Sequence, residues 1–140
     1  ATVTVHDPFT TWKTARFTLT EAANPAISGP AADPDADGIT NEREYVFGTQ
    51  PKSSQPVPAP VITLTGSTVT TSFTALKAAG DGYAGRVRHY AVETTTNMAT
   101  GPWTPMEQFT DVIANDQTVT CVMPTTPVRT FCRLRIWLTP

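Results

Sequence analysis

After residue 60, hydrophobic and polar residues alternate along the chain with a period of two. The alternation occurs in six short segments, separated by turn sequences such as TGS, AAGDGYAG, NDQ and PTTP. Successive side chains of a β-strand point to opposite faces, so this period predicts strands. We expect them at residues 61–65, 68–76, 87–95, 103–109, 117–123 and 130–138.

Six short strands without intervening helices are typical of two antiparallel sheets packed face to face. The predicted fold class is therefore mainly β, an antiparallel β-sandwich of the immunoglobulin or fibronectin kind or of the jelly-roll kind. If the PTTP turn joins the last two strands as a symmetric hairpin, Cys121 lies opposite Cys132. The apolar face of that hairpin, expected in the core, carries Val119, Cys121, Met123, Cys132, Leu134 and Ile136.

The first fifty residues carry helical signals instead. Asp7 is a suitable N-cap, and Pro8 takes the first helical position, where a missing N–H costs nothing. These signals predict a helix over residues 8–17. Two shorter helices are expected at residues 20–24 and 39–48, the second ended by Gly48. We expect a helical segment at residues 1–51, a proline-rich spacer at 52–60 and the β-sandwich at 61–140, in one compact unit.

Composition narrows the class of protein. The 140 residues suffice for one domain with a core, and the 27 threonines favour strands over helices. The formal net charge of −2 argues against a nucleic-acid binder, which carries a basic face. No apolar run approaches the roughly 20 residues of a membrane helix. The start at Ala1, without an initiator methionine or a signal-peptide pattern, is expected of a piece of a longer protein.

Acidic residues are concentrated in the stretch DPDADGITNERE, residues 33–44, which holds five of the chain's twelve. The stretch fits the calcium-loop pattern D-x-[DN]-x-[DN]-G-x₅-E at every specified position. Ca²⁺ takes roughly six to eight oxygen ligands, and aspartates at alternate positions of a tight loop can turn three carboxylates inward. The predicted ligands are Asp33, Asp35, Asp37, the carbonyl of Ile39, Asn41 (directly or through water) and Glu44. The alternative is an acidic, solvated turn in which Thr40 or Asn41 caps the next helix.

The sequence before this loop bears on its role. SGPAA contains glycine and proline and cannot form the long entering helix of a paired calcium sensor, and the sequence has no second loop of this kind. A single loop predicts a structural staple rather than a switch. Calcium that binds only the folded state would add stability.

The run from Phe9 to Pro51 resembles a segment found near the C-termini of large secreted or surface proteins of environmental bacteria, related to the calcium-binding type 3 repeats of thrombospondin. A β-sandwich typically follows that segment, and YAVETTTNMATGPWTPM and FCRLRIWL are similar to its strand motifs. The resemblance covers most of residues 9–138. It implies an extracellular or cell-surface accessory domain that is not catalytic. The sequence departs from the pattern at Ala36 and Gln50, where glycine and aspartate are frequent.

Signals for catalysis are weak. His6 and His89 have no partner at a metal-ligand spacing, and no G-x-S-x-G, H-E-x-x-H, phosphate-loop or C-x-x-C motif occurs. A pair of carboxylates for glycoside cleavage would have to come from Glu93, Glu107, Asp111 and Asp116, and their spacing selects none. We therefore expect no enzyme.

Cys121 and Cys132 leave two interpretations open. Opposed cysteines in a secreted hairpin are a candidate disulfide. Buried cysteines also occur as free thiols in cores, and both positions have the pattern of core residues.

The other face of the last strand carries the candidate ligand-binding residues Phe131, Arg133, Arg135 and Trp137, expected beside Thr118 and Thr120. Exposed aromatic rings stack on sugars, and arginines suit an acidic glycan. The alternative is that the N-terminal helix covers this face through Trp12 and Phe17. The expected function is a noncatalytic, calcium-stabilised accessory module of a secreted multidomain protein that binds polysaccharide. The alternative is a structural, adhesive or surface-anchoring module without a glycan ligand.

Overall fold

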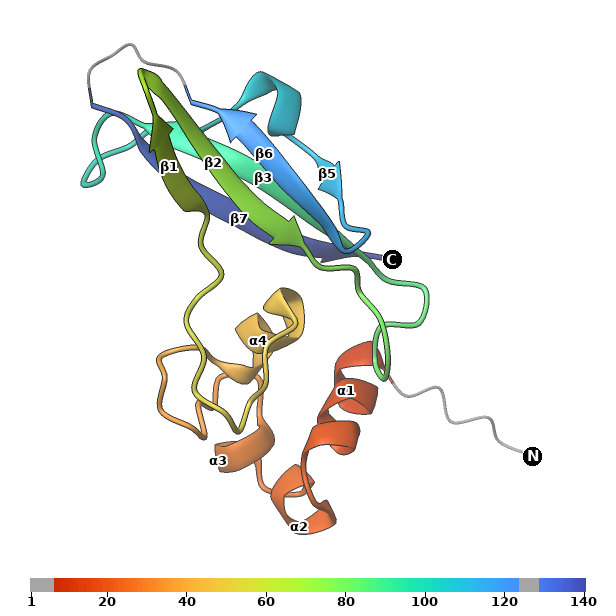
Figure 1. Ribbon diagram of the computed structural model, residues 1–140. Coiled ribbons are helices and arrows are strands. Elements are labelled where there is room, and N and C mark those ends of the chain that lie inside the picture. Colours follow the sequence, from red (N-terminus) through yellow and green to blue (C-terminus); the bar gives the residue numbers. More distant parts are fainter. Residues whose placement is uncertain (1–6, 124–128) are drawn as a thin grey trace. The chain divides into compact units, whose positions relative to one another are not determined.

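The computed structural model describes residues 7–123 and 129–140, and His6 and the PTTP turn lie outside them (Figure 1). The chain forms mainly strands in antiparallel sheets, with a few short helices. Its contacts define two compact units. The first holds residues 7–57 with 78–86 and Pro140, and the second holds 58–77 with the described part of 87–139. Among the helices of the described residues, none has the length and apolar character needed to cross a membrane.

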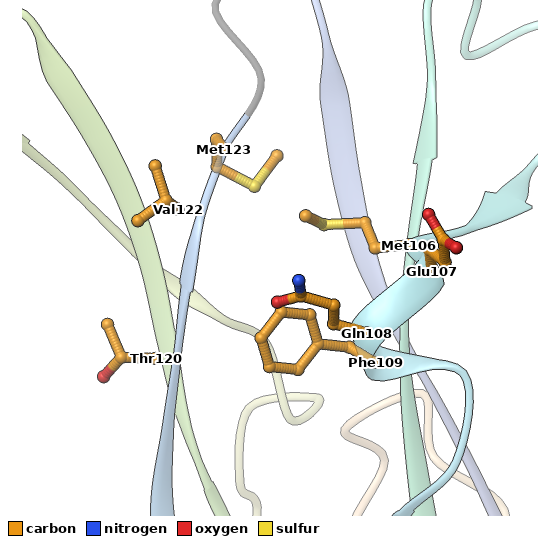
Figure 2. A pocket seen from close by; sticks show the side chains of 7 residues that line it. All are labelled: Met106, Glu107, Gln108, Phe109, Thr120, Val122 and Met123. Atoms are coloured by element: carbon orange, nitrogen blue, oxygen red, sulfur yellow. The ribbon is translucent and has the colours of Figure 1, made fainter.

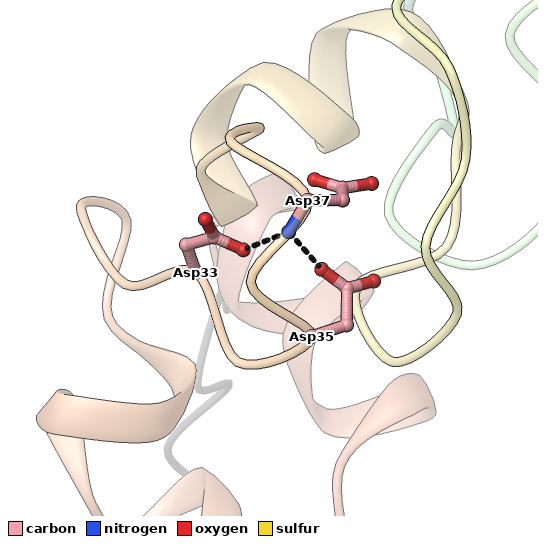
Figure 3. Close-up of side chains that lie close together, drawn as sticks. All are labelled: Asp33, Asp35 and Asp37. Carbon is pink, nitrogen blue, oxygen red and sulfur yellow. Dashed lines mark hydrogen bonds between the residues drawn. The ribbon is translucent and has the colours of Figure 1, made fainter.

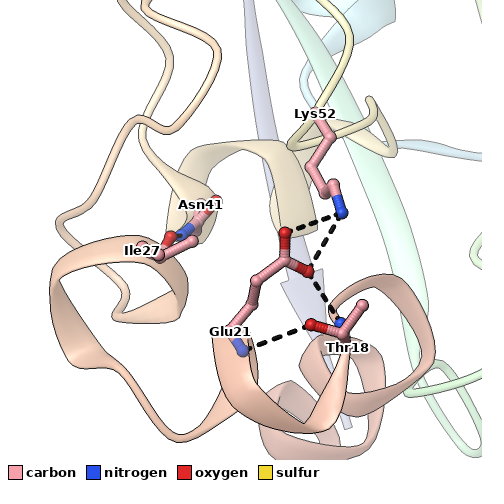
Figure 4. A network of polar contacts seen from close by, with 5 residues as sticks. All are labelled: Thr18, Glu21, Ile27, Asn41 and Lys52. Carbon is pink, nitrogen blue, oxygen red and sulfur yellow. Dashed lines mark hydrogen bonds and ion pairs between the residues drawn. The ribbon is translucent and has the colours of Figure 1, made fainter.

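The first unit begins with helix α1, Pro8–Arg16, as the sequence predicts. The Asp7 carboxylate accepts the N–H of Thr10 and caps the helix. Helix α2, Leu19–Ala22, starts earlier than predicted because Thr18 and Glu21 form a capping box. Lys52 then donates to both carboxylate oxygens of Glu21 at 3.0 Å (Figure 4).

Two further helices flank the acidic loop. Helix α3, Pro25–Ser28, is not among the helices that the sequence predicts, and the side chain of Asn24 caps it. A helix of four residues is too short to show the 3.6-residue hydrophobic period by which helices are predicted from sequence. Helix α4, Asn41–Phe47, ends at Gly48, whose φ of 83° is left-handed. The predicted glycine stop is therefore confirmed.

An aromatic cluster explains why residues 78–86, which connect two strands, belong to the first unit. Tyr45 in α4 stacks on Tyr83 with ring centroids 5.0 Å apart and meets Trp12 of α1 edge-on at 5.7 Å. The Tyr83 hydroxyl donates to the Tyr45 carbonyl at 2.7 Å, and the Tyr45 hydroxyl donates to the Gly82 carbonyl at 2.8 Å. Trp12 is fully buried in this cluster.

The second unit contains two antiparallel sheets (Figure 1). One has the order β1-β2-β6, formed by Val61–Thr65, Thr68–Ala75 and Gln117–Val122. The other has β3 at its centre, paired with β4, β5 and β7, and is formed by Val87–Thr95, Thr104–Pro105, Val112–Ile113 and Phe131–Thr139. Five of the six predicted strands are confirmed within one or two residues of their ends.

The predicted strand at 103–109 is largely wrong. Only β4, two residues long, pairs with β3, and a 3₁₀ turn, Glu107–Phe109, follows it. Pro105 has no N–H to extend the ladder, and the Phe109 N–H bonds to the Met106 carbonyl inside the turn. The chain then forms β5, which the sequence reading missed because the strand has only two residues.

The predicted hairpin of the last two strands is also wrong, since β6 pairs with β2 and β7 pairs with β3. The prediction that their apolar faces are buried holds: Val119, Cys121 and Met123 are buried, and Cys132, Leu134 and Ile136 pack against the same core. A period-two pattern gives the buried face of a strand but does not reveal which sheet holds it. Thr118 and Thr120 therefore do not stand beside the residues of β7.

Candidate metal centre

The acidic loop lies between α3 and α4 and is closed by backbone contacts. The N–H of Asn41 donates to the Ala32 carbonyl at 2.9 Å, which brings the two ends of the loop together. Between them, Ala36 and Gly38 have φ of 60° and 88°, so the chain turns sharply at these two positions. The side chain of Ile39 is fully buried and anchors the loop to the unit.

Three carboxylates converge inside this loop. Asp33, Asp35 and Asp37, here called the aspartate cluster, are half-buried, and each offers an oxygen within 4.8 Å of the others (Figure 3). The N–H of Asp37 donates to Asp33 at 3.2 Å and to Asp35 at 3.4 Å, and the N–H of Gly38 donates to Asp33 at 2.9 Å. The loop amides thus offset part of the negative charge and hold the carboxylates facing one another.

Glu44 is the least satisfied member of the site. It is fully buried, and within residues 7–123 and 129–140 neither of its carboxylate oxygens has a hydrogen-bond partner. Its pKa is raised to about 7, chiefly by burial and then by the negative charges of Asp35, Asp37 and Asp33. The nearby Thr49 hydroxyl lowers the pKa of Glu44, but it is not within hydrogen-bond geometry of the carboxylate.

Asn41 offers a second buried oxygen. Its Nδ2 donates to the carbonyls of Ile27 at 2.9 Å and Gly29 at 2.8 Å, which ties α4 to α3 (Figure 4). Its Oδ1 finds no hydrogen-bond partner in the part of the chain that the structure describes, although the side chain is fully buried. Both amide hydrogens are used by the protein, so the oxygen is the part of this side chain left for a ligand.

The predicted metal ligands thus gather in one place. The aspartate cluster forms the exposed side, and Glu44 is close enough for its pKa to respond to all three aspartates. Every candidate donor is an oxygen, with no imidazole or thiolate, which suits a hard cation. Carboxylates crowded in this way repel one another unless a cation lies between them. The donor set therefore fits Ca²⁺.

The residues predicted to bind a sugar lie on one face of β7, alternating with its core-facing residues. The guanidinium of Arg133 lies 4.2 Å from the Trp103 ring and donates to Glu93 at 2.8 Å. The guanidinium of Arg135 lies 5.1 Å from the Trp137 ring. Sequence reasoning did not place Trp103 and Glu93 on this face, because strand pairing, not sequence distance, brings them there.

Trp137 also stacks on His89 of β3, with ring centroids 5.3 Å apart. His89 lies 2.6 Å from Asp111 through Nδ1 and 2.8 Å from the Thr139 hydroxyl through Nε2. This order of hydroxyl, imidazole and carboxylate is that of a nucleophile with its base. No local sequence pattern indicates this arrangement, because the three residues are far apart along the chain. The Asp111 side chain is 57% exposed, so solvent screens it and weakens any activation of Thr139 through the imidazole.

A pocket of about 650 Å³ lies elsewhere in the second unit, between β6 and the 3₁₀ turn (Figure 2). Its lining consists of Met106, Glu107, Gln108, Phe109, Thr120, Val122 and Met123. Glu107 is the one titratable group among these residues.

Cys121 and Cys132 are both free thiols in the structure. Cys121 is fully buried in the core, and burial raises its pKa to about 11. Cys132 lies on β7 in the other sheet, and burial raises its pKa as well. Neither thiol has the electropositive surroundings of a reactive cysteine.

The candidate residues therefore form two separate sets, a candidate metal site in the first unit and an aromatic and basic face in the second. Comparison of the chain with protein families, curated proteins and solved structures found no match.

Proposed function

We propose that the chain is a noncatalytic module that binds one Ca²⁺ in the loop of residues 33–44 and is stabilised by it. The observation that carries this proposal is Glu44, fully buried with two unpaired oxygens beside the aspartate cluster. A buried carboxylate without a partner is strongly unfavourable, and a bound cation would compensate for it.

The aspartate cluster alone does not distinguish a calcium site from an acidic turn without metal. Its carboxylates already accept hydrogen bonds from loop amides, which an acidic turn without metal also provides. The loop amides leave Glu44 and the Oδ1 of Asn41 unsatisfied, and both are fully buried. Two buried, unpaired oxygens next to three carboxylates favour a ligand of positive charge over a solvated turn.

Calcium is favoured over other divalent ions by the ligands available. Three aspartates, Glu44, the Ile39 carbonyl and Asn41 offer oxygens of the number and kind that Ca²⁺ takes in an EF-hand-like loop. Mg²⁺ retains more of its water and seldom uses an all-protein set, and Zn²⁺ prefers nitrogen and sulfur.

The role of the ion is structural. Glu44 lies in α4. The following residue, Tyr45, stacks on Tyr83 and donates to the Gly82 carbonyl, so α4 contacts the segment 78–86. An ion that binds only the folded protein stabilises this whole arrangement by mass action, by about 2.7 kcal/mol at 100 times the Kd. The resemblance of residues 9–51 to thrombospondin type 3-like segments supports the same role, in an extracellular accessory domain whose second unit is a β-sandwich.

Calorimetric titration of metal-stripped protein tests the proposal. One Ca²⁺ per chain and a rise in Tm are expected. Glu44→Gln should abolish both, whereas Glu42→Gln, an exposed carboxylate in the same helix turn, should leave both unchanged. Absence of calcium binding by the wild-type protein, or equal binding by the Glu44 and Glu42 variants, would overturn the assignment.

A second candidate function is polysaccharide binding by the outer face of β7. The alternation of β7 puts Phe131, Arg133, Arg135 and Trp137 on the face opposite the core, and Trp103 lies beside Arg133. Aromatic rings flanked by guanidinium groups suit an acidic glycan. Both arginines already lie over rings and His89 covers one face of Trp137, so we rank this function second to calcium binding.

Polysaccharide pull-down separates the two functions. Binding of an acidic polymer that Arg135→Ala and Trp137→Ala weaken, but the exposed Arg129→Ala does not, would support the glycan site. Failure to bind acidic and neutral polymers leaves a structural, adhesive or surface-anchoring module, with the calcium site unaffected.

A further inference from the structure

Strand β1 is an exposed edge strand with an apolar sequence. Among the strands of residues 7–123 and 129–140 it pairs with β2 alone (Figure 1). All five of its residues are exposed, and Val61, Ile62 and Leu64 are 64%, 60% and 68% exposed. Its sequence, VITLT, contains no charge, proline or glycine. Natural edge strands are normally protected by such residues against pairing with another chain. β1 lacks that protection.

The backbone groups at the free edge of β1 belong to Ile62 and Leu64. The Met123 N–H donates to the Val69 carbonyl, so Val69 directs its backbone groups toward β6. The alternate residues of β2 direct their backbone N–H and C=O groups toward β1. They are Thr68, Thr70 and Ser72, which pair with Thr65, Thr63 and Val61. The N–H and C=O groups of Ile62 and Leu64 therefore point away from β2.

The side chains of the same two residues share one face. Ile62 stands opposite Thr71, which is fully buried, and Leu64 stands opposite Val69. Cross-strand neighbours project to the same side of a sheet. Ile62 and Leu64 thus lie on the core-facing side of the sheet, but at its edge, where they remain exposed.

We infer that β1 is a self-association surface, on which β1 of a second copy of this chain pairs antiparallel about a two-fold axis at Thr63. In this register Ile62 of each copy lies opposite Leu64 of the other. The two pairs exchange four backbone hydrogen bonds, which use every N–H and C=O that β1 directs to its free edge. The four apolar side chains meet on one face, and the two three-stranded sheets become one.

The absence of charge favours a second copy over a different partner. Two uncharged strands meet without repulsion, whereas a charged peptide would find no opposite charge on β1. A two-fold axis at Thr63 pairs Ile62 with Leu64 and Val61 with Thr65, so every cross-strand pair is uncharged and the apolar pair is made twice. Pro60 has no N–H and ends the pairing one residue beyond Val61. Five residues bury less than the roughly 800 Å² per partner of a stable interface, so free chains should associate weakly.

Disulfide trapping tests the register. A two-fold axis at Thr63 puts the two Thr63 residues opposite each other in a non-hydrogen-bonded pair, with Cα atoms about 4.5 Å apart. Thr63→Cys should therefore form a covalent dimer under mild oxidation. Thr65→Cys, equally exposed, is the control because its two copies would be about 13 Å apart. Equal trapping of both variants, or none of Thr63→Cys above wild type, would overturn the proposal.

Sedimentation tests the association itself. The weight-average mass of the wild-type protein should rise toward that of a dimer between about 10 μM and 1 mM. Leu64→Lys puts two charges into the pair and should keep the protein monomeric. Leu19→Lys changes another exposed leucine, 90% exposed in α2, and should associate like wild type. A monomeric wild type, or identical behaviour of the two variants, would refute the inference.

Discussion

The backbone N–H of Gln55 donates to Oδ2 of Asp37 at 2.9 Å and joins the proline-rich segment after α4 to the acidic loop. The other oxygen of Asp37 accepts the N–H of Ile39 at 2.8 Å. One carboxylate of the aspartate cluster is therefore held from two sides. The proline-rich segment helps to set the position of a predicted calcium ligand.

This contact predicts that calcium protects the Gln55 amide. An ion bound by Asp37 would hold the acceptor in place, so the Gln55 N–H should exchange with deuterium about tenfold more slowly in Ca²⁺ than after metal removal. The exposed neighbour Ser54 is the control, and its exchange should not change. NMR-detected exchange measures both amides in one sample, and equal changes at both would contradict the prediction.

Asn41 should be among the most sensitive positions of the first unit. Asn41→Ala leaves the carbonyls of Ile27 and Gly29 without their donor and opens a cavity between α3 and α4. We expect a loss of about 2–4 kcal/mol in the free energy of unfolding. Urea denaturation measures the loss, and the exposed Asn115→Ala should cost less than about 0.5 kcal/mol. A comparable cost for the two variants would argue against the role of these hydrogen bonds.

The sequence predicted the calcium loop as a local pattern but could not predict the burial of its members. Asp33, Asp35 and Asp37 are recognised by spacing alone. The complete burial of Glu44 depends on the packing of α4, which follows from the tertiary fold. Tyr83 is another example, because a turn between two strands gives no local sign that it packs on the helix holding Tyr45.

The strands show a similar division. The two-residue period gave the boundaries of β3 and the buried face of β7 because both are local properties. The sheet to which β7 belongs depends on long-range pairing, which the PTTP turn suggested incorrectly. The contact of Arg133 with Glu93 follows from that pairing and was therefore not foreseen.

Glu44 should make the stability of the metal-free protein depend on pH. Its pKa is about 7 in the folded protein and near the ordinary 4.5 when unfolded. The folded state therefore binds more protons between these values, and stability falls as the pH rises from 4.5 through 7. Calcium requires the carboxylate form, so the gain in Tm from Ca²⁺ should grow over the same window. Thermal melts at several pH values measure this, and Glu44→Gln should flatten the slope of the metal-stripped protein.

The thiols of Cys121 and Cys132 should react slowly in the native state. Burial raises both pKa values, so little thiolate is present near pH 8. We expect two thiols to react with a chromogenic disulfide reagent in denaturant and almost none in the folded protein. A count of zero in denaturant without reductant would mean that the two cysteines form a disulfide.

Gly82 should tolerate no side chain. Its φ is 85°, and a Cβ there would lie 2.5 Å from the Trp12 Cβ and 2.6 Å from the Pro8 carbonyl oxygen. Gly82→Ala must therefore displace α1 as well as strain the backbone, and we expect a loss of about 3 kcal/mol or more. Gly80→Ala separates the backbone strain from the close contact. Gly80 has a φ of 89°, but no described atom lies within 4 Å of a Cβ at this position. This variant should therefore show only the cost of backbone strain, about 1 kcal/mol. Chemical denaturation compares the two, and equal losses would mean that the close contact with Trp12 contributes nothing.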